Sequence, residues 1–276
     1  MKRLIIAMLV AMSCGSAFAA GKGSPVHFGI GLNAGTNGVG IDASLGLTRF
    51  LQIRGGFSYV PNIDVNYNAD IYNEANMIIN AWNAFSPNAP IPTLPDNVRT
   101  SITPHLTTAH ALLDIYPAGS FHFTVGAYFG QEVILSATNA EPGSLKPVAF
   151  ANECIDIYNN SNIIPGSDGY QVRHIGVQVG DYIFTPDAAG NVQAEIRVKK
   201  VRPYAGIGFG RAVPRKHRVG CSLDLGVQYW GKPTYFSNGE EVAASEFSGD
   251  NQRLVKLLSN TSVYPVVTFR LCGRIF

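Results

Sequence analysis

The sequence predicts an all-β fold, an eight-stranded antiparallel up-and-down transmembrane β-barrel with long extracellular loops that contain short helices. Three observations predict it. Stretches in which apolar residues alternate with small or polar ones recur along the chain, as in strands that separate lipid from a polar interior. Short connections alternate with long ones, which is typical of outer-membrane barrels. Only 14% of the residues are charged, against about 25% in a typical soluble domain.

The N-terminal segment has the pattern of a secretory signal peptide. Lys2 and Arg3 precede an apolar run that ends at Met12, and Ala17 and Ala19 supply small residues before a cleavage site. We expect cleavage after Ala19, so that residues 1–19 are the signal peptide and residues 20–276 form the barrel. Lipidation of Cys14 is an alternative, but the residues before it fit a lipobox poorly. The apolar run is too short to span a bilayer as a helix.

Eight stretches are predicted to be barrel strands. In the first, Ile30 and Leu32 alternate with Gly31 and Asn33, so one face is apolar and the other small or polar. The same alternation recurs in the others, which gives strands at 26–35, 39–49, 51–60, 107–116, 121–131, 201–209, 219–230 and 263–276. The apolar face is expected to contact lipid, and the polar face to line the interior.

The connections fall into two groups. Those at 49–51, 117–120 and 211–218 are short, whereas those at 61–105, 132–192 and 231–262 are long, and the turn at 35–38 is the one short outer loop. An even number of strands puts both termini on the periplasmic side. We predict helices at 69–85, near 147–158 and at 251–258, and a hairpin with arms at 171–183 and 192–200. Ile78, Trp82 and Phe85 are expected on one face of the first helix.

The chain resembles the outer-membrane β-barrel proteins of Bacteroidales-type bacteria, a group of small OmpA-like or porin-like barrels. The segments that carry the resemblance are GIGFGRAVPRKHRVG from Gly206, LGVQYWGKP from Leu225 and VYPVVTFRLCGRIF from Val263. The resemblance covers mainly the strands from about residue 180 onward and implies no catalytic residues. Barrels of this kind usually end in Phe, with apolar residues at every second position counted back from it. Here the apolar residues Ile275 and Leu271 are shifted by one residue from those positions. A bulge near Gly273 could restore the phase.

Charged residues on the predicted inner face form the main candidate site. An unpaired charge in a narrow interior is costly, so acids and bases there must pair. The candidate lumen network consists of Asp42, Arg54, Asp114, Arg202, Asp224 and Arg270, with Arg274 near its end. Eight strands enclose a space that side chains can fill, which predicts a plugged lumen; a narrow gated pore is the alternative.

Catalytic and metal sites are not predicted. Some eight-stranded outer-membrane barrels modify lipid A with a Ser or His and an acidic partner at the rim, and His105, Ser101 and Asp96 would be the candidates here. Their spacing does not require a catalytic site. His27, His110 and His122 are expected to face inward, without the spacing of a metal site. The GxGxG string at 206–210 is not followed by a helix, which argues against a phosphate-binding loop. We therefore predict no enzyme activity, no cofactor and no metal.

Three cysteines follow the signal peptide, Cys154, Cys221 and Cys272. Their odd number and wide spacing argue against a disulfide framework. The alternation puts Cys221 and Cys272 on opposite faces of the barrel wall, so we predict no disulfide between them.

The predicted function is that of an integral outer-membrane protein with a structural or interaction role. The alternatives are a small pore or apolar-ligand transport barrel and, second, a lipid A-modifying enzyme. The expected partners are outer-membrane lipids and lipopolysaccharide, the barrel-assembly machinery during biogenesis, and an extracellular partner bound through loops 61–105 and 132–192. The net charge of +2 is too small to indicate a nucleic-acid partner.

Overall fold

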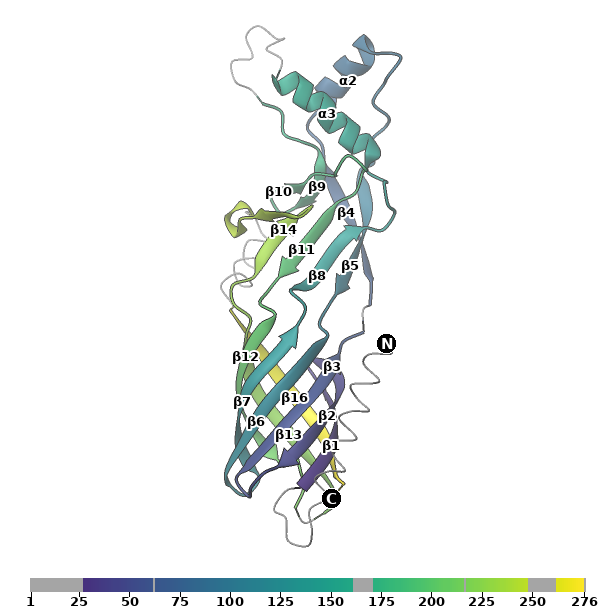
Figure 1. Cartoon of the computed structure of the whole chain (residues 1–276). Coiled ribbons are helices and arrows are strands. Elements are labelled where there is room, and N and C mark those ends of the chain that lie inside the picture. The colour runs from purple at the N-terminus through teal and green to yellow at the C-terminus, as the bar shows by residue number, and fades with distance from the viewer. Residues whose placement is uncertain (1–26, 62, 161–170, 216, 248–261, 276) are drawn as a thin grey trace.

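The computed structural model describes residues 27–61, 63–160, 171–215, 217–247 and 262–275. The molecule is elongated, with a barrel at one end, a second sheet beyond it and two helices at the far end (Figure 1). No helix among these residues is long and apolar enough to cross a membrane.

The barrel is closed by eight antiparallel strands. In order around the wall they are β1 (His27–Gly35), β16 (Val263–Arg274), β13 (Val219–Tyr229), β12 (Val201–Gly210), β7 (Phe121–Gly130), β6 (Thr108–Ala118), β3 (Leu51–Tyr59) and β2 (Gly38–Gly46). Strands that follow one another in the barrel sequence are neighbours in the wall, and β1 pairs with β16 to close it. The predicted up-and-down, eight-stranded barrel is confirmed.

The alternation of the sequence sorts side chains between the two faces of the wall. On β13, Leu223, Leu225 and Val227 are exposed, whereas Asp224 and Gln228 are buried. On β16 the pairing with β1 is continuous across Gly273, and the pairing with β13 is regular up to Gly273, so no bulge shifts the phase there. The outer face of the barrel is therefore a belt of exposed apolar side chains, which we call the apolar belt; it includes Ile30, Leu32, Ile41, Ile53, Phe57, Ile115, Phe123, Val125, Ile207, Leu223, Leu225, Val227, Val267, Phe269 and Leu271.

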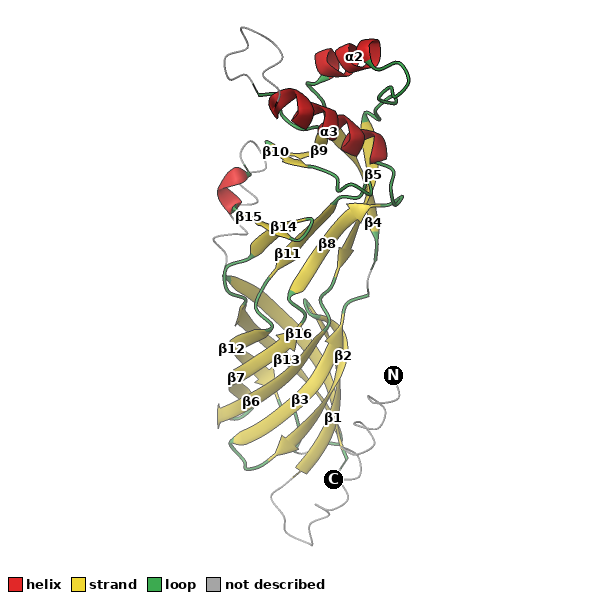
Figure 2. Ribbon diagram, turned by 45° about the horizontal axis from the view of Figure 1, so that its top comes forward, coloured by secondary structure: helices red, strands yellow, loops and turns green. Residues whose placement is uncertain are grey.

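The long loops fold together into a second eight-stranded sheet, which the sequence analysis did not predict. Its strands, in order, are β10 (Tyr182–Phe184), β9 (Gly176–Val179), β4 (Val65–Tyr72), β5 (Asn97–Pro104), β8 (Val133–Asn139), β11 (Gln193–Arg197), β14 (Thr234–Ser237) and β15 (Glu240–Val242). Several continue a barrel strand after a short break, as β8 continues β7 and β12 continues β11 (Figure 2). We call this part of the chain the outer module.

Two helices complete the outer module, α2 (Asn76–Phe85) and α3 (Lys146–Asn160), together with a 3₁₀ turn, η1 (Ala244–Glu246). Ile78 of α2 and Val148 and Ile155 of α3 are buried in an apolar core shared with the sheet. Trp82 of α2 packs edge-on against Phe150 of α3, with ring centroids 6.3 Å apart. The helix predicted near 147–158 is confirmed as α3.

The helix predicted at 69–85 is wrong in its first part. Residues 65–72 form β4, in which apolar side chains alternate with period two, and the helical period fits only from Ala75 onward. The Asn73 side chain accepts a hydrogen bond from the Ala75 backbone N–H, 3.0 Å away, between strand and helix. Phe85, expected on the apolar face, is 88% exposed.

The predicted hairpin between 171–183 and 192–200 is also wrong. β9 and β10 form a hairpin of their own, because Gly180 has a φ of 64° and permits a tight turn between them. β11 pairs instead with β8 and β14. The helix predicted at 251–258, the cleavage site and Cys14 lie outside the described residues.

Candidate functional site

The centre of the barrel is crossed by an ion-pair cluster built on Arg54. Arg54 lies on β3 and Asp224 on β13, directly across the barrel in the strand order. The guanidinium donates two hydrogen bonds to the Asp224 carboxylate, at 2.9 and 2.8 Å, and its Nη2 lies 3.1 Å from Oδ1 of Asp114 on β6. This cluster joins three strands through the lumen.

Two further side chains bond these carboxylates, although Oδ2 of Asp114 has no hydrogen-bond partner among the described residues. His122 Nε2 lies 2.8 Å from Oδ1 of Asp224, and the Thr124 hydroxyl donates to Asp114 at 2.7 Å. Ligand atoms of Asp114, His122 and Asp224 lie within 4.8 Å of one another, as in a metal site. The Arg54 guanidinium already bonds both carboxylates, so it takes the place that a cation would occupy.

A second cluster joins β2 and β16 across the intervening strand β1. Arg270 bonds the Asp42 carboxylate through Nε, at 2.9 Å, and through Nη2. Asn33 donates to the same carboxylate at 3.1 Å. The pair passes over Gly31 of β1, where an added Cβ would lie 2.8 Å from Asp42 Oδ1. Glycine at this position therefore makes room for the ion pair.

Arg202 and Arg274 lie apart from these clusters. Arg202 is the second residue of β12, near the end of the barrel that joins the outer module. It donates to the backbone carbonyls of Lys199 and Gln131, at 3.0 and 2.6 Å, and stacks on Trp230. Arg274 donates to the carbonyl of Arg215. The expected pairing of Arg202 with lumen aspartates is wrong, because Arg202 sits too near the strand end.

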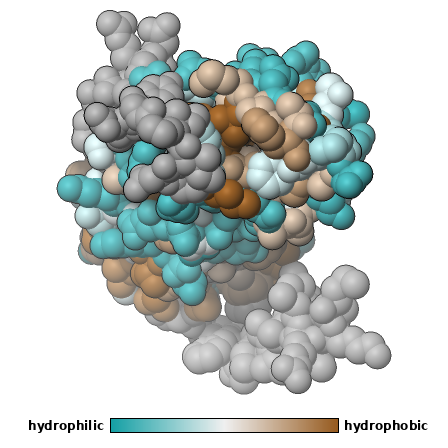
Figure 3. Space-filling model, turned by 90° about the horizontal axis from the view of Figure 1, so that it is seen from above, coloured by the Kyte–Doolittle hydropathy of each residue, from teal (hydrophilic) through white to brown (hydrophobic). Residues whose placement is uncertain are grey.

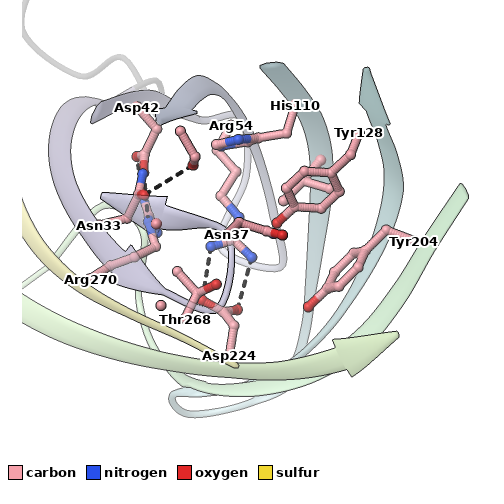
Figure 4. Close-up of a pocket in the computed structure, with 14 residues that line it drawn as sticks. Asn33, Asn37, Asp42, Arg54, His110, Tyr128, Tyr204, Asp224, Thr268 and Arg270 are labelled. Atoms are coloured by element: carbon pink, nitrogen blue, oxygen red, sulfur yellow. Dashed lines mark hydrogen bonds and ion pairs between the residues drawn. The ribbon is translucent and has the colours of Figure 1, made fainter. Parts of the chain in front are cut away.

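The lumen between the clusters is almost filled. The space among Asn33, Arg54, His110, Tyr128, Tyr204 and Arg270 amounts to 10 Å³ (Figure 4), about the volume that one water-sized sphere needs. The Tyr204 side chain lies along the inner wall over Gly206 of its own strand and Gly226 of the neighbouring β13, where an added Cβ would lie 2.5 Å from its hydroxyl. The glycines of the 206–210 string thus accommodate an aromatic side chain.

The barrel end at the short turns is closed by backbone. Ala212 and Val213, in the turn between β12 and β13, are buried. Gln52 accepts from the Val213 N–H at 3.1 Å and donates to its carbonyl at 3.3 Å. The Tyr116 hydroxyl accepts from the Ala212 N–H at 3.1 Å. This turn folds into the barrel mouth.

Comparisons with known proteins give structural likenesses only. CarO2 of Acinetobacter baumannii has 12% identity and a TM-score of 0.42, covering 90% of this chain and 98% of that chain. CarO of the same organism has 14% identity and a TM-score of 0.41, covering 91% and 99%. A major outer membrane protein from Thermus thermophilus has 12% identity and a TM-score of 0.33, covering 91% and 99%.

No protein-family model matches the chain. No curated protein matches its sequence. The fold assignment therefore rests on the closed strand order of the chain itself, and the resemblance to Bacteroidales-type barrels stays a prediction.

The histidines and the catalytic candidates lie in separate places. His110 packs on Tyr128, with ring centroids 5.2 Å apart, and His27 begins β1. His105 Nε2 lies 3.0 Å from the Ser136 hydroxyl rather than from Ser101. Ser101 is held within β5 between Asn66 and Thr138, and the Asp96 carbonyl accepts from the Ile71 N–H. The contacts of the described residues do not link His105, Ser101 and Asp96 into a catalytic triad.

The cysteines of the barrel wall lie on opposite faces, as predicted. Cys221 is exposed and pairs with Leu271, whereas Cys272 is buried and pairs with Gly220. Both are free, as is the buried Cys154 of α3.

The outer module contains a cavity that the sequence analysis missed. It has a volume of 210 Å³ and lies on one face of the second sheet. Its lining is mostly apolar, with small side chains at Ala69, Ala137 and Ala194 and larger ones at Val177 and Phe184. Seen from the helix end, apolar side chains gather around a hollow (Figure 3). The sequence signal is a single alanine on each of β4, β8 and β11, and it can be recognised only once the pairing of the strands is known.

Proposed function

We propose that the chain is an integral outer-membrane protein whose barrel is a closed anchor and whose outer module is its interacting part. The apolar belt supports membrane insertion, because a soluble protein would not expose so large an apolar surface. In this orientation the short turns and both termini face the periplasm, and the outer module stands outside the cell.

The observation that carries the closed anchor is the filled lumen. The free space at its centre is 10 Å³, whereas a water-filled channel needs a continuous path. Arg54 spans the lumen to Asp224, and residues 211–214 close the periplasmic mouth. A barrel of this kind holds the protein in the membrane without conducting.

The outer module supplies the surface for a partner. It contains loops 61–105 and 132–192, folded into β4, α2, β5, β8, α3, β9 and β10. Met77 and Phe85 of α2 are exposed at its far end. We assign it an interaction role without catalysis, since the His, Ser and acidic candidates do not converge.

Planar-bilayer conductance of the purified protein tests the proposal, together with gel migration before and after boiling. We expect faster migration of the unboiled form, which shows a folded barrel, and no steady channels. Arg54→Ala is the informative variant, because it removes the group that spans the lumen, and brief conducting events should become more frequent. Steady channels in the wild type would contradict the closed anchor, and absence of a migration shift would contradict the membrane barrel.

A second candidate function is binding of a small apolar molecule in the outer cavity. Ala137 of β8 and Ala194 of β11 are paired. Two small side chains therefore lie side by side on the sheet, and the space above them is not filled. A dry apolar cavity of about 150 Å³ is enough to hold benzene, and this one has 210 Å³. A compact aromatic or short aliphatic compound is therefore the ligand class that fits.

Calorimetric titration with indole tests this candidate, with the protein in lipid nanodiscs and empty nanodiscs as the blank for partitioning. Saturable binding should disappear in Ala137→Leu/Ala194→Leu, which fills the cavity. Ser101→Leu is the matched control, because residue 101 alternates with Thr100 and Ile102 and points away from it. Equal indole binding by the filled variant would exclude the cavity as the site.

A further inference from the structure

Arginines gather at the periplasmic end of the barrel, in turns whose sequences contain no Asp or Glu. Arg49 lies between β2 and β3, Arg211, Arg215 and Arg218 lie between β12 and β13, and Arg274 ends β16. The sequence has no Asp or Glu within residues 43–60, 115–131, 201–223 or 263–276. The nearest carboxylates along the chain, Asp42, Asp114 and Asp224, are buried in the lumen clusters. These arginines therefore have no acidic partner from the turns that carry them.

Arg211 is held rigidly among three periplasmic turns. Its guanidinium donates to the Gly119 carbonyl, at 2.7 Å from Nη2 and 3.1 Å from Nε, and to the Arg49 carbonyl at 3.4 Å. It also lies over the Tyr116 ring, 4.4 Å from the centroid. Partial burial, and then the positive charge of Arg215, lower the pKa of Arg211. The turns thus hold like charges close together.

A recess of 540 Å³ lies beside these side chains. It is lined by Arg49, Arg211 and Arg215, and its edge includes Phe50 and Val219. Phe50 is 49% exposed and Val219 62% exposed, and Val219 begins β13 at the lower edge of the apolar belt. The recess therefore presents arginine guanidinium groups next to an apolar surface.

We propose that this arginine recess binds the phosphate of an anionic phospholipid in the periplasmic leaflet. The phosphate lies between Arg49 and Arg215 beside the fixed Arg211, and the acyl chains follow Phe50 and Val219 along the barrel. Arginine guanidinium groups suit phosphate oxygens because they donate paired hydrogen bonds. The inference rests on the membrane orientation of the proposed function. Inorganic phosphate shares the headgroup chemistry but lacks the acyl chains.

The experiment measures binding of phosphatidylglycerol to the full-length protein in phosphatidylcholine nanodiscs. The readout is the temperature at which the fast-migrating folded band is lost, followed as phosphatidylglycerol is increased. We expect phosphatidylglycerol to raise this temperature in the wild type in a saturable way. In Arg49→Gln/Arg215→Gln, half-saturation should need about thirtyfold more lipid, since each basic residue near a membrane surface contributes about 1 kcal/mol.

Arg99→Gln/Lys232→Gln is the charge-matched control, because both residues are exposed in the outer module; its response should equal that of the wild type. An equal response in all three proteins would overturn the proposal. An equal effect of inorganic phosphate alone would overturn the lipid assignment in favour of a simple anion site. Each protein must show the gel shift first, so absence of a lipid effect in a wild type that keeps its shift rejects this inference and leaves the membrane barrel standing.

Discussion

The lumen side chains explain how a barrel with a polar interior avoids isolated charges. Arg54 is placed between Asp114 and Asp224, and His122 and Thr124 each add a contact to one of these carboxylates. Removing one partner from such a buried set leaves an uncompensated charge, which costs more than the set itself contributes. The identity of each side chain is therefore coupled to its neighbours across the barrel.

Arg54→Met tests this coupling. It leaves two buried carboxylates without their cation, and we expect the free energy of unfolding in lipid vesicles to fall by about 3–5 kcal/mol, measured by denaturant titration. The triple variant Arg54→Met/Asp114→Asn/Asp224→Asn should recover at least half of the loss, because it removes the unpaired charges. Arg99→Met, on exposed β5, is the control and should stay within about 0.5 kcal/mol of the wild type. Equal stability of Arg54→Met and the wild type would refute the coupling.

Gly31→Ala tests the room that glycine leaves for the Asp42–Arg270 pair. The new Cβ would lie 2.8 Å from Asp42 Oδ1 and 3.0 Å from Arg270 Nη2, so the pair must shift, and we expect a loss of about 1–3 kcal/mol in stability. Gly55→Ala is the matched control, since the nearest atom to its Cβ is the His110 carbonyl oxygen at 3.6 Å. The same denaturant titration compares the two. If Gly31→Ala lowers the stability no more than Gly55→Ala does, the Asp42–Arg270 pair does not need the space that glycine leaves.

At the scale of elements, the barrel strands could be predicted because one face of each is apolar and the other is small or polar. That condition imposes a strict period of two, as in Ile30, Leu32 and their small neighbours, and it needs no knowledge of pairing. The outer strands lack this condition. β8 mixes apolar and polar residues without a clean period. The end of β4 is predicted to be helical because its apolar residues are followed closely by those of α2.

The inward positions of the charged residues could also be predicted, but their partners could not. Alternation assigns a residue to a face, whereas contact depends on its height in the barrel and on the stagger of the strands. Arg54 and Asp224 come to the same height on opposite strands, while Arg202 lies at the rim and bonds carbonyls. The outer cavity depends likewise on the pairing of Ala137 with Ala194.

Leu225→Arg tests the lipid contact of the belt. Leu225 lies midway along β13 on the outer face, where an arginine costs about 2–4 kcal/mol, while near the membrane interface the cost falls to about 0–1 kcal/mol. We therefore expect Leu225→Arg to destabilise the folded protein in vesicles several times more than Val219→Arg, at the start of the same strand. Equal losses for the two variants, or none for Leu225→Arg, would mean that this face does not lie in lipid.

At the scale of the whole molecule, charge is divided between the two ends. Apart from the three lumen aspartates, every Asp and Glu of the sequence lies within residues 61–105, 132–200 or 231–262, which belong to the long outer segments. The short turns at the other end carry only basic charges. The two ends of the molecule therefore present opposite electrostatic surfaces, which suits different surroundings on the two sides of one membrane.

Single-cysteine labelling of intact cells tests this orientation. Phe85 is 88% exposed at the far end of the outer module, and Ala118 is exposed at the end of β6, next to a short turn at the opposite end of the molecule. We expect Phe85→Cys to react with a membrane-impermeant maleimide on whole cells, and Ala118→Cys to react only after the cells are opened. The wild type is a suitable blank, because Cys272 is buried in the barrel, Cys221 lies on the outer face of the barrel, which we propose to be covered by lipid, and burial raises the pKa of the Cys154 thiol and slows its reaction. The reverse pattern would turn the molecule over in the membrane, placing the outer module in the periplasm and the arginine recess at the cell surface.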